Sequence, residues 1–253
     1  MMKNNKFIIR DTIIILIAIF MSFNIKAQGK LFPNKLEKWS IGAGVGAAEF
    51  YGDLVSDKLS PGFTLQLNTV VDSYHSLQAE FVMGRLTGNR LFNSNQIAGE
   101  MFDAEFMELD FNFLINISSL FDKELNFDNN RLTKKYQDRS INFMAKFGFG
   151  LNMFRTKRNE LNGEQFINSY GYEWQWENNF KHAGTKHVPW NKNIVEKTLV
   201  LGFVTNYKIS QKVAINFSAT SRIGGNDKWD AMINQKDDMF MFYSLGTTYK
   251  ITD

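Results

Sequence analysis

The stretch MELDFNFLINI at residues 107–117 decides the fold. Bulky apolar side chains stand at every odd position, and polar side chains stand at 108, 110, 112 and 116. Successive side chains of a β-strand point to opposite faces, so a period of two predicts a strand with one apolar and one polar face. Residues 141–153 repeat the pattern, with phenylalanines at 143, 147 and 149 opposite Asn142, Lys146 and Gly148.

Eight segments of 11 to 16 residues share this alternation. They are 39–51, 62–72, 76–89, 104–117, 140–155, 194–209, 213–224 and 239–251. One face carries Phe, Leu, Ile and Met, whereas the other carries Gly, Ser, Asn, Thr and a few charges. In a small closed barrel within a membrane, the bulky face meets lipid and the polar residues fill the narrow lumen. The sequence therefore predicts an all-β fold, a closed eight-stranded antiparallel up-and-down transmembrane β-barrel.

Connection lengths support the same topology. Outer-membrane barrels have short periplasmic turns and long outer loops. The connections at 73–75 and 210–212 are short, while those at 90–103, 156–193 and 225–238 are long. The segment 118–139 is too long for a periplasmic turn, so we expect a short helix or an extension beneath the barrel there. Ring-bearing residues near strand ends, Trp39, Tyr207 and Tyr249, suit an aromatic girdle.

Residues 1–27 have the pattern of a signal peptide, leaving 28–253 as the barrel domain. Lys3, Lys6 and Arg10 precede the apolar run 12–23, and Ala27 suits a cleavage site. An uncleaved anchor is the alternative, but it needs about 20 apolar residues. Removing this segment takes away the whole formal charge of +3, so nothing indicates a nucleic-acid partner. The chain has no cysteine, which excludes disulfides and thiolate chemistry.

Three short segments resemble a known family. They are Phe50–Leu54 (FYGDL), Met83–Gly88 (MGRLTG) and Asp238–Lys250 (DMFMFYSLGTTYK). They look like the eight-stranded barrel of OmpA-like outer-membrane proteins, in the branch of PorG-like accessory barrels of Gram-negative bacteria with type IX secretion. The resemblance implies a location in the cell outer membrane and an accessory role in secretion or surface assembly. We expect the chain to depart from the OmpA-like pattern by lacking the C-terminal peptidoglycan-binding domain.

A polar network is predicted in the lumen. Its members are Glu80, Glu108, Asp110, Lys146 and Arg222, and Glu196 is expected nearer the outer rim. Charges in a narrow lumen must pair, since losing water costs several kcal/mol each. An internal salt-bridge network is the favoured interpretation, with a gated ion or solute path and carboxylate catalysis as alternatives. The glycines of 42–46 lie in a strand with no following helix, so they are expected to make room in the lumen rather than bind phosphate.

The long loop 156–193 is the candidate for partner contact. It carries the aromatic residues Tyr170, Tyr172, Trp174, Trp176 and Trp190, and the spacing of two from 170 to 176 predicts a hairpin above the membrane. Exposed aromatics are common anchors of interfaces, although a loop packed on itself or on lipopolysaccharide is the simpler interpretation. His182 and His187 lie in the same loop, while His75 lies in a short turn. We expect no metal at any of them.

The sequence predicts a non-enzymatic, monomeric barrel without a cofactor. Its expected partners are outer-membrane lipid and lipopolysaccharide, with an envelope protein bound through the outer loops or the 118–139 segment. A lipid A-modifying enzyme and a narrow pore are the alternatives. Asn226-Asp227-Lys228-Trp229-Asp230, in the last long loop, is expected to form a capped turn, with calcium binding as its alternative.

Overall fold

The computed structural model describes residues 39–54, 58–72, 74–91, 99–120, 139–161, 165–177, 180–187, 195–225, 228–232 and 238–251. The predicted signal peptide, most of the 118–139 segment and Trp190 lie outside these residues. All described residues belong to one compact unit, Lys35–Asp253. Among them, no helix has both the length and the apolar character needed to cross a membrane.

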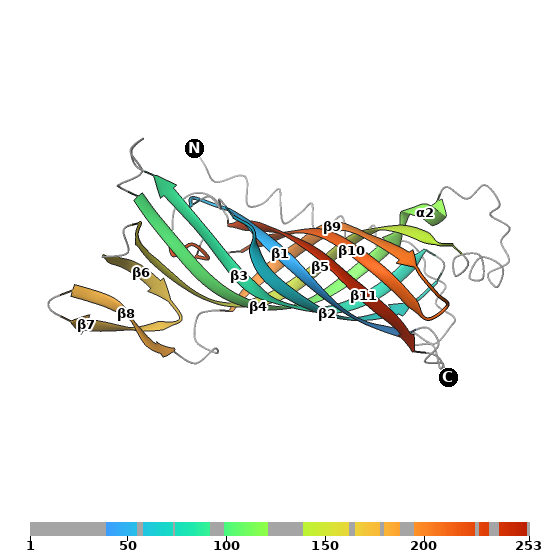
Figure 1. Cartoon of the computed structure of the whole chain (residues 1–253), viewed down its shortest axis with the longest axis horizontal. Coiled ribbons are helices and arrows are strands. Elements are labelled where there is room, and N and C mark those ends of the chain that lie inside the picture. The colour runs from blue at the N-terminus through green and yellow to red at the C-terminus, as the bar shows by residue number, and fades with distance from the viewer. Residues whose placement is uncertain are drawn as a thin grey trace, which may run out of the picture. The chain divides into compact units, whose positions relative to one another are not determined.

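Eight strands form a closed antiparallel ring. They are β1 (Trp39–Tyr51), β2 (Ser60–Val70), β3 (His75–Leu91), β4 (Gly99–Asn116), β5 (Ile141–Glu160), β9 (Val195–Lys208), β10 (Val213–Gly224) and β11 (Met239–Ile251). The hydrogen-bonded order runs β4-β3-β2-β1-β11-β10-β9-β5, and β4 pairs with β5 to close the ring. The first and last strands pair along their whole lengths, from Trp39 with Ile251 to Tyr51 with Met239. The predicted eight-stranded up-and-down barrel is confirmed (Figure 1).

Three ring strands are longer than the sequence predicts. β3, β4 and β5 have 17, 18 and 20 residues, whereas a tilted strand crosses a bilayer in about 9–11 residues. The extra residues lie at the end that carries the long loops, called here the outer end. There β6 (Phe166–Tyr170) pairs with β5 over Thr156–Asn159, and β7 (Tyr172–Glu177) pairs with β8 (Phe180–His187) in a separate hairpin.

The opposite end, called here the turn end, has short connections. In the β2–β3 turn, Asp72 Oδ1 accepts hydrogen bonds from the backbone N–H groups of Tyr74 and His75 at 2.7 and 2.8 Å. In the β9–β10 turn, Ser210 Oγ accepts from the N–H of Val213 at 3.1 Å. After β4 the chain forms a single helical turn, α2 (Ile117–Leu120), at this end (Figure 1).

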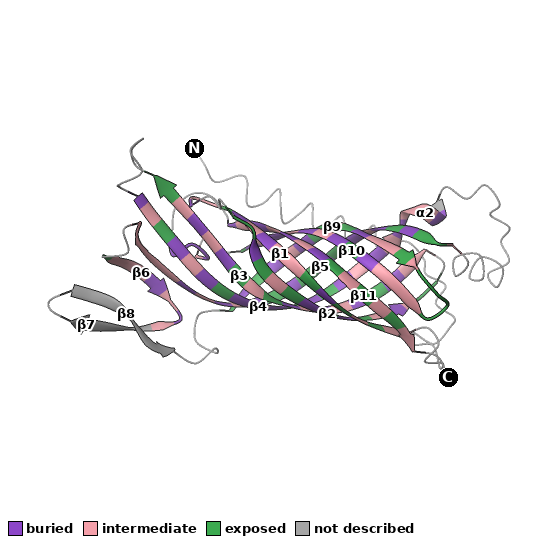
Figure 2. Cartoon of the chain, viewed as in Figure 1, coloured by how far each residue is buried: buried purple, intermediate pink, exposed green. Residues whose placement is uncertain are grey.

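Burial alternates along every ring strand, as the stripes of Figure 2 show. Most of the side chains that point away from the ring are apolar, and Val45, Phe111, Phe149 and Phe203 are 60–67% exposed. The side chains that point into the ring include most of the buried charged and amide groups. This distribution is the reverse of a water-soluble protein, in which charged residues are almost never fully buried.

The lumen is not uniformly polar, and here the sequence-based expectation is wrong. Its outer half holds an aromatic cluster of Phe50, Phe102, Phe106, Phe154, Phe240 and Phe242, with Leu54, Val82, Leu86 and Trp229. A smaller apolar cluster of Leu114, Met144 and Val204 lies nearer the turn end. Large rings fit because glycines leave room: a Cβ on Gly46 or Gly62 would lie within 2.6 Å of the Phe242 ring.

Candidate functional site

The predicted lumen residues meet in one buried charge cluster. Glu80 comes from β3, Glu108 and Asp110 from β4, Lys146 from β5 and Arg222 from β10, and each is at most 2% exposed. The alternation of each strand directs these side chains inward, and closure of the ring brings β3, β4, β5 and β10 around the same space. Five residues far apart in the sequence thus form one network.

Arg222 is the centre of the cluster. Its Nε donates to Glu108 Oε1 at 2.8 Å, and its Nη2 lies 3.3 Å from both Glu80 Oε2 and Asp110 Oδ2. Its Nη1 donates to the hydroxyl of Thr220. The guanidinium fork of arginine suits several carboxylates at once, whereas a lysine could not match this geometry. Three acids are therefore held by one cation.

Lys146 supplies the second positive charge. Its ammonium donates to Glu80 Oε2, while Gln66 Nε2 donates to Glu80 Oε1 at 3.0 Å. Asn152 Nδ2 donates to Glu108 Oε2 at 2.6 Å. Buried charges are tolerated when they are paired and their remaining lone pairs are hydrogen-bonded, and both glutamates meet that condition. Glu196, expected nearer the outer rim, is also buried and stands opposite Asn152 in the β5–β9 register.

An amide layer lies between the charge cluster and the turn end. Gln78 Nε2 donates to Asn68 Oδ1 at 2.8 Å, and Asn112 Nδ2 donates to Gln78 Oε1 at 3.3 Å. On the other side of the lumen, Asn216 Nδ2 donates to Thr248 Oγ1 at 2.5 Å. These side chains link β2, β3 and β4 on one side and β10 and β11 on the other. Together with the charge cluster they fill the lumen with hydrogen-bonded side chains, as in other small barrels.

Arg222 also contacts the aromatic cluster. Its guanidinium carbon lies 5.1 Å from the Phe242 ring centre and 5.7 Å from that of Phe240. A cation over a ring face is attracted by the ring's quadrupole, by about 2 kcal/mol when it is desolvated. The guanidinium therefore contacts both the acids and the aromatic rings. The two fillings of the lumen meet at this residue.

Trp229 closes the outer end of the lumen. Although it belongs to the loop between β10 and β11, it is fully buried and its ring centre lies 5.0 Å from that of Phe240. The backbone N–H of Trp229 donates to Asp238 Oδ2 at 2.7 Å. The chain turns back at Ala231, whose φ of 58° is rare for a residue with a side chain. The described residues 228–232 of this loop thus turn into the barrel instead of projecting from it.

The carboxylate of Asp230 accepts two backbone hydrogen bonds that hold this part of the loop in place. Oδ2 accepts from the N–H of Leu54, and Oδ1 accepts from the N–H of Met232, at 3.3 and 2.9 Å. The bond from Met232 caps the turn at 228–231, and the bond from Leu54 links this turn to the residues after β1. Asn226 and Asp227, the other residues of the calcium alternative, lie outside the described residues. No metal-binding group of three or more His, Asp or Glu residues occurs within the described ranges.

The band of outward-facing apolar side chains that includes Val45, Phe111, Phe149 and Phe203 is called here the apolar belt. Beyond this belt, the extended strands carry charges on their outward face. Arg85 Nη2 lies 3.1 Å from Asp103 Oδ2, and Lys157 Nζ lies 4.0 Å from the same carboxylate. Burial raises the pKa of the Tyr172 hydroxyl, and the nearby carboxylates of Glu105 and Asp103 raise it further. Since charged pairs are costly in hydrocarbon, this part of β3–β5 is suited to water.

The structure divides the predicted partner-contact residues between two elements. Tyr170 ends β6 and packs against the aromatic cluster, with Lys228 Nζ 5.8 Å from its ring centre. Tyr172, Trp174 and Trp176 lie on β7, which confirms a hairpin in this loop but places Tyr170 outside it. His182 and His187 lie on β8, and His75 Nδ1 pairs with Asp72 at 2.8 Å in the short turn.

The fold and the lumen define a membrane β-barrel with a filled interior. Among solved structures it is similar to Ail, the attachment invasion locus protein of Yersinia pestis, at 14% identity over 83% of this chain and 96% of that chain, with a TM-score of 0.44. It is similar to Neisserial surface protein A at 10% identity over 85% and 97%, with a TM-score of 0.48. No protein-family model and no curated protein matches the chain. The strand pairing within this chain shows that the barrel is closed.

Proposed function

We propose that the protein is an integral outer-membrane β-barrel with a non-enzymatic role, in which the barrel holds the outer ends of β3–β5 and the β7–β8 hairpin at the cell surface. One observation carries this proposal: the apolar belt surrounds a lumen filled by the charge cluster and closed by Trp229. A filled interior favours a barrel that anchors surface segments in the membrane over a barrel that conducts ions or solutes. The extended strands and the hairpin then provide the surface on which a partner acts.

The proposed partner is a component of a secretion or surface-assembly complex. The resemblance to PorG-like accessory barrels supports this finer assignment, with type IX secretion as the proposed process. The extended strands offer ion pairs, and β7 carries Tyr172, Trp174 and Trp176. Tyrosine and tryptophan are over-represented among the residues that dominate binding energy at interfaces.

The test compares association with and without the hairpin. The tagged full chain is purified from outer membranes in mild detergent, beside a variant in which 172–187 is replaced by a short Gly-Ser linker. The control inserts the same linker between Ser210 and Gln211 at the turn end. We expect stable co-purification of an envelope protein, lost in the hairpin variant and kept in the control. Equal association in all three proteins would contradict the proposal.

The pore and enzyme alternatives are tested on the same preparations. Because the lumen is filled, we expect no ion conductance in planar bilayers. We also expect identical lipid A mass profiles with and without the protein. Discrete conductance steps would favour the pore. A lipid A change reversed by the native chain but not by the His182→Ala, His187→Ala variant would favour the enzyme.

A further inference from the structure

Asp110 is the acid of the charge cluster whose hydrogen bonding is incomplete. Its Oδ2 lies 3.3 Å from Arg222 Nη2, but its Oδ1 is buried and has no hydrogen-bond partner among the described residues. Glu80 and Glu108, by contrast, use both of their carboxylate oxygens. A buried carboxylate oxygen without a donor is costly, so a positively charged ligand or a proton would stabilise this position.

The charges of the cluster do not balance. The cluster holds the three carboxylates of Glu80, Glu108 and Asp110 against the two cations of Lys146 and Arg222. All five side chains are buried, and a buried charge without a partner is strongly destabilising. One monovalent cation beside Asp110 Oδ1 would make the cluster neutral.

Oxygens of Asp110 and Thr198 meet above a bare glycine. Gly150 of β5 stands between Asp110 of β4 and Thr198 of β9 in the strand register. A Cβ on Gly150 would lie 2.1 Å from Asp110 Oδ1 and 2.4 Å from Thr198 Oγ1, so both oxygens face the space above this glycine. Thr198 Oγ1 is buried without a partner in the described part of the chain, and so is Oδ1 of Asn152, the next inward residue of β5.

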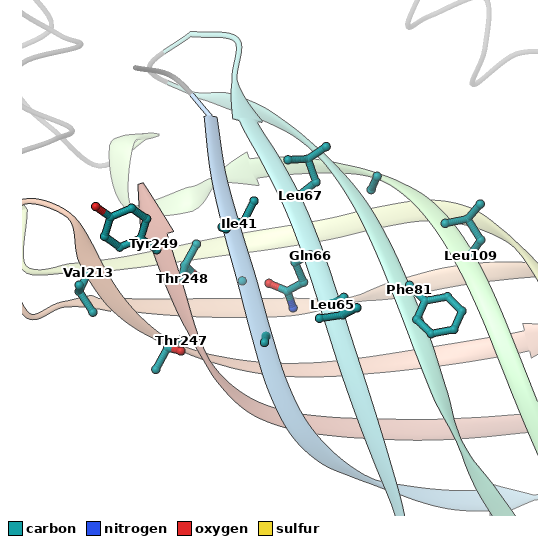
Figure 3. Close-up of a pocket in the computed structure, with 13 residues that line it drawn as sticks. Ile41, Leu65, Gln66, Leu67, Phe81, Leu109, Val213, Thr247, Thr248 and Tyr249 are labelled. Atoms are coloured by element: carbon teal, nitrogen blue, oxygen red, sulfur yellow. The ribbon is translucent and has the colours of Figure 1, made fainter. Parts of the chain in front are cut away.

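This lumen site differs from the apolar groove on the outside of the barrel. The groove, about 710 Å³ in volume, runs across the outward face of the wall from β10 to β4 (Figure 3). No charged residue is among the described side chains that line it, and it belongs to the apolar belt. The groove therefore offers nothing that selects an ion, whereas the lumen site has both a negative charge and oxygen ligands.

We propose that the space beside Gly150 is a binding site for one monovalent metal cation such as sodium, with Asp110 Oδ1 and Thr198 Oγ1 as ligands and Asn152 Oδ1 as a third. Hard cations prefer oxygen ligands, and carboxylate, hydroxyl and amide oxygens are all of this kind. A proton on Asp110 would remove its charge but could bond to only one of the other oxygens. A divalent ion would leave the cluster with an excess positive charge. The inference goes beyond the proposed function, because the site lies inside the ring and needs no partner at the outer end.

The experiment measures the sodium dependence of folding. Urea unfolding of the full-length barrel in phosphatidylcholine vesicles is recorded at constant ionic strength and pH, while sodium chloride replaces N-methylglucamine chloride in steps. The N-methylglucamine cation is too bulky for a site between two side-chain oxygens. An ion that binds only the folded state raises the folding equilibrium constant, by about tenfold for each tenfold increase in sodium above the dissociation constant. We expect this rise in the native chain.

Two variants remove ligands of the ion, and each has a matched control. Asp110→Asn removes the charge, and Thr198→Val removes the hydroxyl but keeps the volume and every charge of the cluster. Both should abolish the sodium dependence. Asp103→Asn removes a carboxylate from the outward face of the same strand, and Thr64→Val removes another buried lumen hydroxyl that lacks a partner among the described residues. Both controls should keep the sodium dependence. If Asp110→Asn does not fold, Thr198→Val alone decides.

Several results would overturn the inference. A native folding constant that does not change with sodium would exclude the site. If that constant also depended on pH in the native chain but not in Asp110→Asn, the charge would be balanced by a proton instead of an ion. An equal sodium dependence in the native chain and Thr198→Val would place the ion elsewhere. Stabilisation by calcium at concentrations where sodium has no effect would contradict a monovalent ligand.

Discussion

Arg222 on β10 donates from Nε to Glu108 Oε1 on β4 at 2.8 Å, across the inside of the ring. The two strands are separated in the ring by β5 and β9, so this contact exists only because the barrel closes. The same guanidinium also meets Glu80 and Asp110 and lies against Phe240 and Phe242. It joins the charged and aromatic parts of the lumen.

Removing this cation should be strongly destabilising. Arg222→Met keeps much of the side-chain volume but leaves buried carboxylates without their main partner, and breaking a buried pair in this way costs about 3–5 kcal/mol. Lys146→Met should cost less, since Glu80 is its one carboxylate partner among the described residues. Urea-dependent unfolding of the reconstituted barrel measures both. Adding Glu108→Gln to Arg222→Met should recover part of the loss. Equal costs for the two single variants would contradict the central place of Arg222.

We expect the Trp229 side chain to close the outer end of the lumen. Trp229→Ala removes a fully buried ring from the aromatic cluster, which costs about 3–5 kcal/mol in a core that cannot collapse. We expect the loop between β10 and β11 to become sensitive to added protease, while the native loop resists. Bilayer conductance should stay absent, because the charge cluster still fills the lumen beneath. Trp39→Ala, at the turn end, is the control and should leave the loop resistant.

A charge on the outward face should be costly at the depth of Phe111 and tolerated at Glu105. Both residues are on β4 and point outward, but Phe111 lies within the apolar belt and Glu105 lies beyond it. Phe111→Arg should cost about 2–4 kcal/mol, the value for arginine near the bilayer midplane. Glu105→Arg should cost close to nothing by comparison. Folding yield into vesicles and urea titration give the difference, and similar costs at both sites would contradict the position of the belt.

Tyr172 should ionise above its ordinary pKa near 10. Burial is the largest cause, and the carboxylates of Glu105 and Asp103 add to it. The folded state therefore holds this proton more tightly than the unfolded chain. The resulting stability is complete below about pH 10 and is lost as the pH rises through the raised pKa. The ultraviolet difference titration between the native chain and Tyr172→Phe reports the group, and Glu105→Gln should lower its pKa. An unchanged pKa in Glu105→Gln would show that the carboxylate has no part.

The alternation of 107–117 and 141–153 was sufficient to predict the barrel and the inward direction of its charges. A period of two determines the face of the sheet on which each side chain lies. Closure of the ring then places the charged side chains of the polar face together in the lumen. The aromatic half of the lumen was not predictable in the same way. In Met239–Tyr243 every residue is apolar, so the pattern does not say that Phe240 and Phe242 point inward.

The inward loop was missed for a different reason. A tryptophan between Lys228 and Asp230 has the composition of an exposed loop, and its burial depends on space that only the closed barrel creates. The lengths of β4 and β5 were underestimated because Asp103 and Lys157 interrupt the apolar face while the strands continue. The sequence shows where the outward apolar side chains stop, but the backbone hydrogen bonds between the strands continue beyond that point.

The most direct test of the account is the environment of consecutive positions along β4. Single spin labels at 107–113 in the reconstituted barrel are exposed in turn to oxygen, which concentrates in lipid, and to a water-soluble nickel complex. We predict high oxygen access at 107, 109, 111 and 113, and low access to both reagents at 108, 110 and 112. High nickel access at the odd positions, or no alternation at all, would contradict a barrel whose apolar face meets hydrocarbon.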